Sequence, residues 1–132
     1  MKLLVISGPT GSGKTTLSIQ ISKKNRNSIV LSTDNYYKTG IMSKIISKFI
    51  GNFYDREISF NYKRFKKDLN CIINNAELNH KYTYDFKSKT IKKTIHKQSN
   101  LELLILEGIF TKYVLSKFNK KYCFHIELKT KK

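Results

Sequence analysis

A glycine-rich segment near the N-terminus constrains the fold of this chain more than any other feature. Residues 8–15 read GPTGSGKT, after an apolar run, Leu3 to Ile6, and before a helix-compatible run, Thr16 to Lys24. A strand, a glycine-rich loop ending in Lys and Thr, and a helix are typical of a phosphate-binding loop, whose backbone N–H groups surround an anion. A turn without a ligand would need neither the lysine nor the threonine. The segment therefore predicts an α/β fold with a nucleoside triphosphate site.

The residues of this loop have separate chemical tasks. The Lys14 side chain places a mobile positive charge on the β and γ phosphates, and the Thr15 hydroxyl contributes to the coordination of Mg²⁺. The helix that follows directs the positive end of its dipole at the same phosphates. We therefore expect ATP and Mg²⁺ as cofactors. The residues expected to hold ATP are Gly8, Pro9, Thr10, Gly11, Ser12, Gly13, Lys14, Thr15 and Thr16.

The basic composition of the chain bears on its partners. The formal net charge is +17 at pH 7, and such an excess often indicates a nucleic-acid partner. Only Arg26, Arg56 and Arg64 are arginines among the 26 basic residues, and the lysines are spread along the whole chain. Side chains that read guanine or phosphate in a bidentate manner are therefore scarce. We expect no specific nucleic-acid partner, only nonspecific adhesion to polyanions at low salt.

The N-terminal apolar run and the cysteines bear on the cellular compartment. The apolar run stops at Gly8 and Pro9, too early for a signal peptide or a membrane span. Cys71 and Cys123 are isolated and lack the paired spacing of a zinc site, so both are expected as free thiols in a reducing compartment. We expect a cytoplasmic protein that does not bind a membrane. The histidines are equally scattered: His80, His96 and His125.

Strand-like and helix-like runs alternate along the chain. This alternation predicts one domain, residues 1–132, of α/β class, with a parallel sheet and helices on both faces. The apolar run Leu101 to Leu106 is expected at the centre of the sheet. Tyr82 to Phe86 and Lys89 to Ile95 predict two extended segments around a turn. Further strands are expected at 28–32 and 122–128, and further helices at 41–50, 62–73 and 110–118.

Acidic residues follow two of the predicted strands. Asp34 comes after the second strand, and Glu107 follows the central strand, directly before Gly108. Ligands of open parallel sheets collect at the carboxyl ends of the strands, where phosphoryl transfer to a hydroxyl needs a carboxylate base and a metal ion. We interpret Asp34 as a candidate base and Glu107 as a carboxylate near Mg²⁺ or its waters. A helix cap or turn is the alternative role for Asp34.

Four segments resemble those of one enzyme family. Residues 34–38, DNYYK, resemble the acceptor-binding motif of the uridine kinase family, within the phosphoribulokinase group. Residues 52–55, NFYD, resemble its segment that touches the nucleoside. Residues 84–90, YDFKSKT, resemble its hairpin, and residues 104–110, LILEGIF, resemble its strand ending in Glu-Gly-Ile. The chain is therefore similar to phosphate-loop kinases of this family.

The resemblance implies transfer of the ATP γ-phosphate to the 5′-hydroxyl of a pyrimidine nucleoside. Asp34 would accept the hydroxyl proton, and Tyr37 and Asp55 would hold the sugar. Aromatic side chains would form the walls around the base. The family usually has His where Lys89 stands, which changes the contacts at that point. The implied substrate-binding residues are Asp34, Tyr37, Tyr54, Asp55, Tyr84, Phe86 and Lys89.

The chain also departs from the family pattern. Residues 56–58 read REI where the family has His-Pro-Asp, and the sequence stops at Lys132, before the family's arginine-rich lid and final strand. A sheet without that strand has an unpaired edge, which predicts self-association or a complementing chain. Three alternatives stay open: a sister kinase for nicotinamide riboside, pantothenate or a sugar phosphate; a truncated, weakly active nucleotide-binding protein; and a nucleic-acid-dependent ATPase.

Overall fold

A four-stranded parallel sheet forms the centre of the molecule. The computed structural model describes residues 1–9, 11–38, 48, 59–112 and 123–129. The strands of the sheet are β1 (Lys2–Ser7), β2 (Ser28–Ser32), β5 (Leu103–Glu107) and β6 (Cys123–Glu127). They lie in the order β2-β5-β1-β6, and every neighbouring pair is parallel. The predicted parallel sheet is confirmed.

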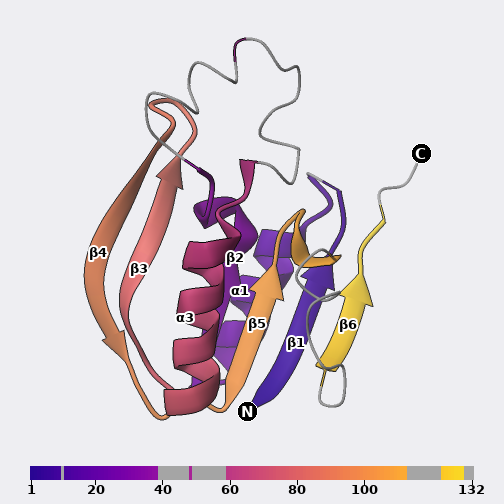
Figure 1. The fold of residues 1–132 in the computed structure, drawn as a ribbon. Helices are drawn as coiled ribbons and strands as arrows, with labels where there is room; N and C mark the ends of the chain where they lie inside the picture. The colour runs from indigo at the N-terminus through magenta and orange to yellow at the C-terminus, as the bar shows by residue number, and fades with distance from the viewer. Residues whose placement is uncertain (10, 39–47, 49–58, 113–122, 130–132) are drawn as a thin grey trace.

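Helices lie on both faces of this sheet. Helix α1 (Lys14–Lys24) lies behind the strands in Figure 1, and helix α3 (Tyr62–Asn75) lies in front. Phe65, Leu69 and Ile72 are fully buried on one face of α3, which follows from apolar residues spaced by about one helical turn. The helix ends at Asn75, its C-cap Ala76 has a φ of 52°, and the Cys71 thiol donates to the Glu77 carbonyl beyond it. Cys71 is a free thiol, as predicted.

Strand β5 is buried on both of its faces. Leu104, Ile105 and Leu106 have no exposed surface, because β5 lies between β1 and β2 in the sheet and between helices across it. A continuous apolar run is typical of such a strand. The structure confirms the predicted central position of this run, with the strand at Leu103–Glu107 instead of Leu101–Leu106.

A separate antiparallel hairpin lies beside α3. Strand β3 (Leu78–Asp85) pairs with β4 (Thr90–Gln98), and Tyr84 lies opposite Ile91. The hairpin was expected, but both strands are longer than the predicted 82–86 and 89–95. The extra residues are largely polar and exposed, so they carry little apolar signal, and cross-strand hydrogen bonds hold them. At the turn, Asp85 Oδ1 accepts a hydrogen bond from the Lys87 backbone N–H.

The remaining predicted elements are described only in part. The predicted helix at 41–50 lies outside the described residues except for residue 48, and only residues 110–112 of the predicted helix at 110–118 are described. In the described part of the chain, no strand pairs with the outer side of β6. Self-association through that edge stays a prediction. None of the described helices combines the length and apolar character that a membrane crossing requires.

Candidate active site at the phosphate loop

The glycine-rich loop lies between the end of β1 and the start of α1. Gly13 is the N-cap of α1 and has a φ of 94°, in the left-handed region that glycine adopts without strain. The Ser12 backbone N–H donates to the Pro9 carbonyl oxygen at 3.2 Å, which closes the turn. The loop thus passes from a buried strand to a helix N-terminus within a few residues, the arrangement that favours an anion. Thr10 lies outside the described residues.

Lys14 is buried although it carries a charge. Only 6% of the residue is exposed, and its Nζ donates to the Pro9 carbonyl oxygen at 2.8 Å. The side chain therefore folds back across the loop, and it lines a cavity of about 480 Å³. A desolvated ammonium group interacts with an anion much more strongly than one in water. Lys14 is thus placed to hold a phosphate at this cavity.

Of the two acidic residues singled out in the sequence, Asp34 lines this cavity, and Glu107 accepts a hydrogen bond from Thr15, which also lines it. Glu107 ends β5, where it pairs in register with Ile6 of β1 and Ser32 of β2. Asp34 belongs to the 3₁₀ helix η1 (Thr33–Asn35), which directly follows β2. Thr15 Oγ1 donates to Glu107 Oε1 at 3.4 Å. The described residues lining the cavity are Gly11, Gly13, Lys14, Thr15, Thr16, Asp34 and Phe86.

Three polar atoms at this site are buried without a hydrogen-bond partner among the described residues. They are Ser12 Oγ, Asp34 Oδ1 and Glu107 Oε2. Buried polar groups are normally hydrogen-bonded, and an orphaned group costs free energy. Hydroxyl and carboxylate oxygens are the ligands that Mg²⁺ prefers. The donor set of Thr15 and Glu107 therefore fits a magnesium ion or its waters. The described residues contain no group of three or more His, Cys, Asp or Glu side chains arranged to hold a metal by themselves.

Burial changes the acidity of both carboxyl groups. Burial raises the pKa of Asp34 above its ordinary 3.8, and the positive charge of Lys14 opposes part of that shift. Burial also raises the pKa of Glu107 above its ordinary 4.5, and the negative charge of Asp34 adds to the rise. A carboxylate with a raised pKa holds a proton more readily, which suits a group that must accept one.

Three of the predicted aromatic residues, Tyr37, Tyr84 and Phe86, form one connected cluster. Tyr37 is buried, with its ring centroid 4.8 Å from that of Tyr84 and 6.0 Å from that of Phe110. Tyr84 in turn contacts Phe86, at 4.9 Å between centroids. Phe86 is 70% exposed and lines the cavity. The hairpin therefore brings one aromatic wall to the site, with Tyr84 and Tyr37 behind it.

Other predicted substrate residues lie elsewhere. Lys89 lies in the hairpin turn with a φ of 54°, exposed, and it does not line the cavity. Tyr54 and Asp55 lie outside the described residues. The roles of Tyr54 and Asp55 in binding the acceptor therefore stay predictions.

The structure adds a residue that sequence reasoning missed. Asn35 Oδ1 accepts a hydrogen bond from the Tyr84 backbone N–H at 3.1 Å, which ties the hairpin to η1. Short amide side chains often bond to backbone groups in turns, but their usual partner is a few residues away. The partner here lies 49 residues along the chain, so only the folded structure shows it.

Gly108 holds the loop after β5 close to η1. Its φ is 131°, and a Cβ atom built there would lie 1.9 Å from Thr33 Oγ1. Thr33 Oγ1 also accepts a long hydrogen bond, 3.4 Å, from the Phe110 backbone N–H. The close approach of Gly108 to Thr33 therefore brings the loop after Glu107 next to η1, which contains Asp34.

The sequence of this chain is similar to those of known uridine kinases. A uridine kinase from Borrelia duttonii is 31% identical over 109 residues, which make up 83% of this chain and 52% of the relative. The chain thus spans about half the length of the curated relatives it matches. No family model matches the chain. The resemblance to uridine kinases inferred from the motifs is confirmed.

Solved structures show the same fold. The YGR205w protein is 26% identical, with a TM-score of 0.59, and the match covers 83% of this chain and 45% of that one. A structure described as a possible uridine kinase from Bacillus stearothermophilus is 21% identical, with a TM-score of 0.57, covering 84% and 62%. The predicted α/β fold of phosphate-loop kinases is confirmed.

Proposed function

We propose that this chain binds ATP with Mg²⁺ and transfers the γ-phosphate to the 5′-hydroxyl of a pyrimidine nucleoside. The observation that carries the proposal is the shared cavity of Lys14, Thr15 and Asp34, with Glu107 hydrogen-bonded to Thr15. A phosphate-holding cation, a candidate base and oxygen ligands for a metal are the parts that phosphoryl transfer needs. Similarity to uridine kinases supports the choice of a nucleoside.

In the proposed reaction, Asp34 accepts the proton of the attacking hydroxyl. The hydroxyl oxygen forms a bond to the γ-phosphorus, and the bond from that phosphorus to the oxygen bridging the β and γ phosphates breaks, which leaves ADP. Lys14 holds the phosphates in place through its buried ammonium group. Thr15 and Glu107 would hold Mg²⁺, which neutralises phosphate charge when it is bound.

The acceptor is proposed to lie against the hairpin side of the cavity. Phe86 offers an exposed ring there, and Tyr84 and Tyr37 support it from behind. A flat base gains from stacking on such a ring. Tyr54 and Asp55 complete the acceptor site in this proposal, on the strength of the motif alone. Lys89 would approach the acceptor only if the hairpin turn moves toward the cavity.

A second candidate is a nucleotide-binding protein that needs another chain, a second copy or a different protein, for full activity. The chain spans about half the length of the curated relatives it matches. A sister kinase for another small acceptor, such as nicotinamide riboside or pantothenate, is the alternative within the enzyme class. We expect base preference to depend on residues 56–58 and the hairpin turn, where the sequence departs from the family pattern.

The test is ADP release from ATP and Mg²⁺ in the presence of uridine, cytidine, nicotinamide riboside or pantothenate. We expect turnover that depends on uridine or cytidine and that is lost in Lys14→Ala. Tight ATP binding without any acceptor-dependent turnover would support the second candidate. Turnover with pantothenate or nicotinamide riboside alone would identify a sister kinase and overturn the pyrimidine assignment.

A further inference from the structure

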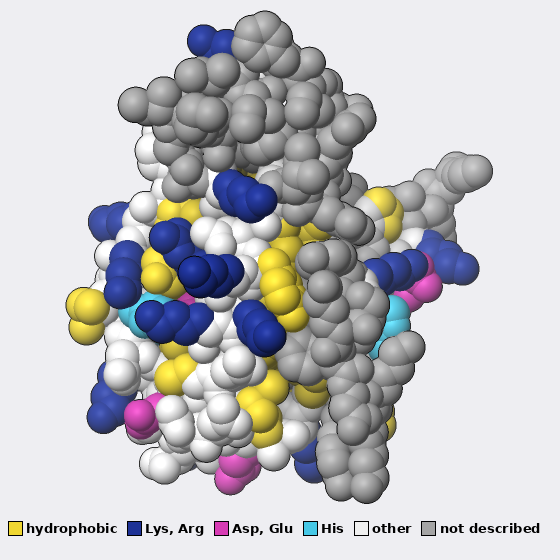
Figure 2. Space-filling view, viewed as in Figure 1, with side chains coloured by type: hydrophobic (Ala, Val, Ile, Leu, Met, Phe, Trp, Pro, Cys, Tyr) yellow, Lys and Arg dark blue, Asp and Glu magenta, His cyan; other side chains and the backbone are white. Residues whose placement is uncertain are grey.

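A second cavity lies between α3 and the β3–β4 hairpin. Its volume is about 600 Å³, within the range of small-molecule sites. None of its lining residues lines the cavity at the phosphate loop. Figure 2 shows Lys and Arg side chains gathered over α3 and the hairpin. The cations that line the cavity are Lys63, Arg64, Lys67 and Lys93.

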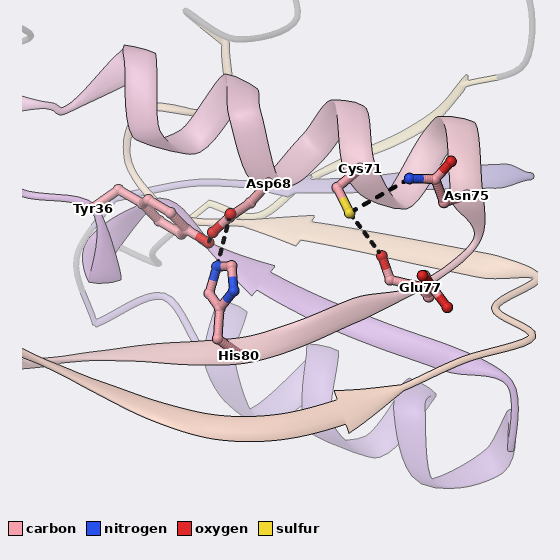
Figure 3. Close-up of polar contacts among 6 residues, drawn as sticks. All are labelled: Tyr36, Asp68, Cys71, Asn75, Glu77 and His80. Atoms are coloured by element: carbon pink, nitrogen blue, oxygen red, sulfur yellow. Dashed lines mark hydrogen bonds and ion pairs between the residues drawn. The ribbon is translucent and has the colours of Figure 1, made fainter.

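Asp68 is the one acid among the described lining residues, and both of its carboxylate oxygens already have hydrogen-bond partners. Tyr36 donates its hydroxyl proton to Asp68 Oδ2 at 2.6 Å, and His80 Nε2 bonds to Asp68 Oδ1 at 2.8 Å (Figure 3). Asp68 is only 2% exposed. Within the described part of the chain, none of the four cations forms an ion pair, because the ion pairs there join His80 to Asp68 and Lys112 to Glu127. As far as the described residues go, the cavity therefore carries an excess of positive charge.

The cations of α3 are held on the side that faces the hairpin. The Arg64 guanidinium lies 4.9 Å from the centre of the Tyr82 ring, a cation–π distance. Asn61 caps the helix by accepting a hydrogen bond from the Arg64 backbone N–H at 3.1 Å. Lys63 and Lys67 are four positions apart and lie one above the other on the helix. Like charges at this spacing repel each other unless an anion lies between them.

We propose that this cavity binds a small molecule with adjacent phosphates, such as an inorganic polyphosphate or the phosphate chain of a nucleotide. Several neighbouring cations match several neighbouring phosphate charges, and the planar guanidinium of Arg64 suits bidentate phosphate contacts. The site goes beyond the proposed kinase function and does not depend on it. A single-stranded nucleic acid fits less well, because it needs exposed aromatic faces for stacking, and Arg64 covers the Tyr82 ring.

The test uses tripolyphosphate as the probe and equilibrium dialysis as the measurement. All proteins carry Lys14→Ala, so that the phosphate loop contributes little to binding. The buffer contains salt at about 150 mM, which screens exposed charges beyond roughly 8 Å. One variant adds Lys67→Gln and Lys93→Gln, which removes two cations from the cavity. The control adds Lys66→Gln and Lys92→Gln, which removes two exposed lysines from the same helix and strand without touching the cavity.

We expect the Lys67→Gln, Lys93→Gln variant to bind tripolyphosphate at least about tenfold more weakly, and the control to change by less than about twofold. Circular dichroism and melting temperature verify that both variants are folded. Equal weakening in both variants would overturn the proposal, because binding would then follow net charge alone. Absence of binding in the Lys14→Ala background at millimolar probe would also overturn it. So would binding of an oligothymidylate that depends on Lys67 and Lys93 while tripolyphosphate binding does not.

Discussion

Asp68 on the one hand, and Asp34 and Glu107 on the other, are acids with little exposed surface, yet their surroundings differ. Both oxygens of Asp68 have partners, Tyr36 and His80. Asp34 Oδ1 and Glu107 Oε2 have none among the described residues. A buried carboxylate with both oxygens bonded stabilises the fold, whereas an orphaned one costs stability. We propose that Asp68 is a structural acid, whereas Asp34 and Glu107 are positioned for a ligand.

The hydroxyl of Tyr36 shows the structural side of this comparison. Burial and the hydrogen bond to Asp68 raise the pKa of the Tyr36 hydroxyl well above its ordinary value, so this hydroxyl stays protonated. Its ring lies edge-on to Phe65 and Tyr82, at 5.1 Å and 5.6 Å between centroids. The neighbouring residue, Tyr37, instead belongs to the aromatic cluster behind Phe86. Two adjacent tyrosines thus serve the two regions separately.

The largest expected effect is that of Lys14→Ala on phosphoryl transfer. The substitution removes the buried cation from the phosphate-loop cavity, and losing a cation that stabilises the transferring phosphate costs about 10³-fold or more in rate. ADP release at saturating ATP measures it. The hydrogen bond to the Pro9 carbonyl is also lost, so a decrease of about 1 kcal/mol in the free energy of unfolding is expected as well. Unchanged turnover would refute the phosphate-loop assignment.

Asp34→Asn should lower the transfer rate by about 10² to 10³-fold while ATP binding stays nearly intact, because a general base acts on the acceptor. The pKa of Asp34 is raised by burial, and the base must be deprotonated. The wild-type rate should therefore rise with pH through a pKa above the ordinary 3.8. Rate–pH profiles and ATP titrations measure both. Equal loss of ATP binding would make Asp34 a metal ligand or structural residue instead.

Asp68→Asn tests the structural side of the comparison. The substitution keeps the shape but replaces the carboxylate that is hydrogen-bonded to His80 and to the Tyr36 hydroxyl with a neutral amide. We expect a loss of about 2 kcal/mol in the free energy of unfolding, since a buried hydrogen bond to a charged group is worth roughly 1.5 to 3 kcal/mol. Urea unfolding measures it. Glu102→Gln, which changes an exposed acid, serves as the control and should be nearly neutral.

The sequence was sufficient to predict the parallel sheet, the central strand and the position of the glycine-rich loop between β1 and α1. Each has a local signal: the continuous apolar run that ends in Glu107, and the fixed glycines before Lys14. The position of Asp34 and Glu107 at one edge follows from strand order alone. The same reasoning did not find the Tyr36–Asp68–His80 network or the bond from Asn35 to the Tyr84 backbone. Their partners lie 12 to 49 residues apart and depend on how the hairpin packs against α3 and η1.

Glu107→Gln has the smallest expected effect. It should raise the free energy of unfolding, whereas Asp68→Asn should lower it. Burial raises the pKa of Glu107 above its ordinary 4.5, so the folded state binds this proton more tightly than the unfolded state does. Stability from this group is therefore greatest at low pH and is lost as pH rises through the folded-state pKa. Glu107→Gln removes that loss, and we expect a gain of about 0.5 to 1 kcal/mol in the free energy of unfolding at neutral pH.

Urea unfolding across a pH series measures the effect of Glu107→Gln, and Glu127→Gln is the matched control. Glu127 is exposed, and its hydrogen bond and ion pair with Lys112 lower its pKa. Its contribution to stability is present above the ordinary pKa of 4.5 and is lost as pH falls through the lowered one. The two variants should therefore change the pH dependence in opposite directions. A loss of stability in Glu107→Gln at neutral pH would mean that this carboxylate is satisfied in the folded chain, as Asp68 is, and would remove the contrast between the two regions.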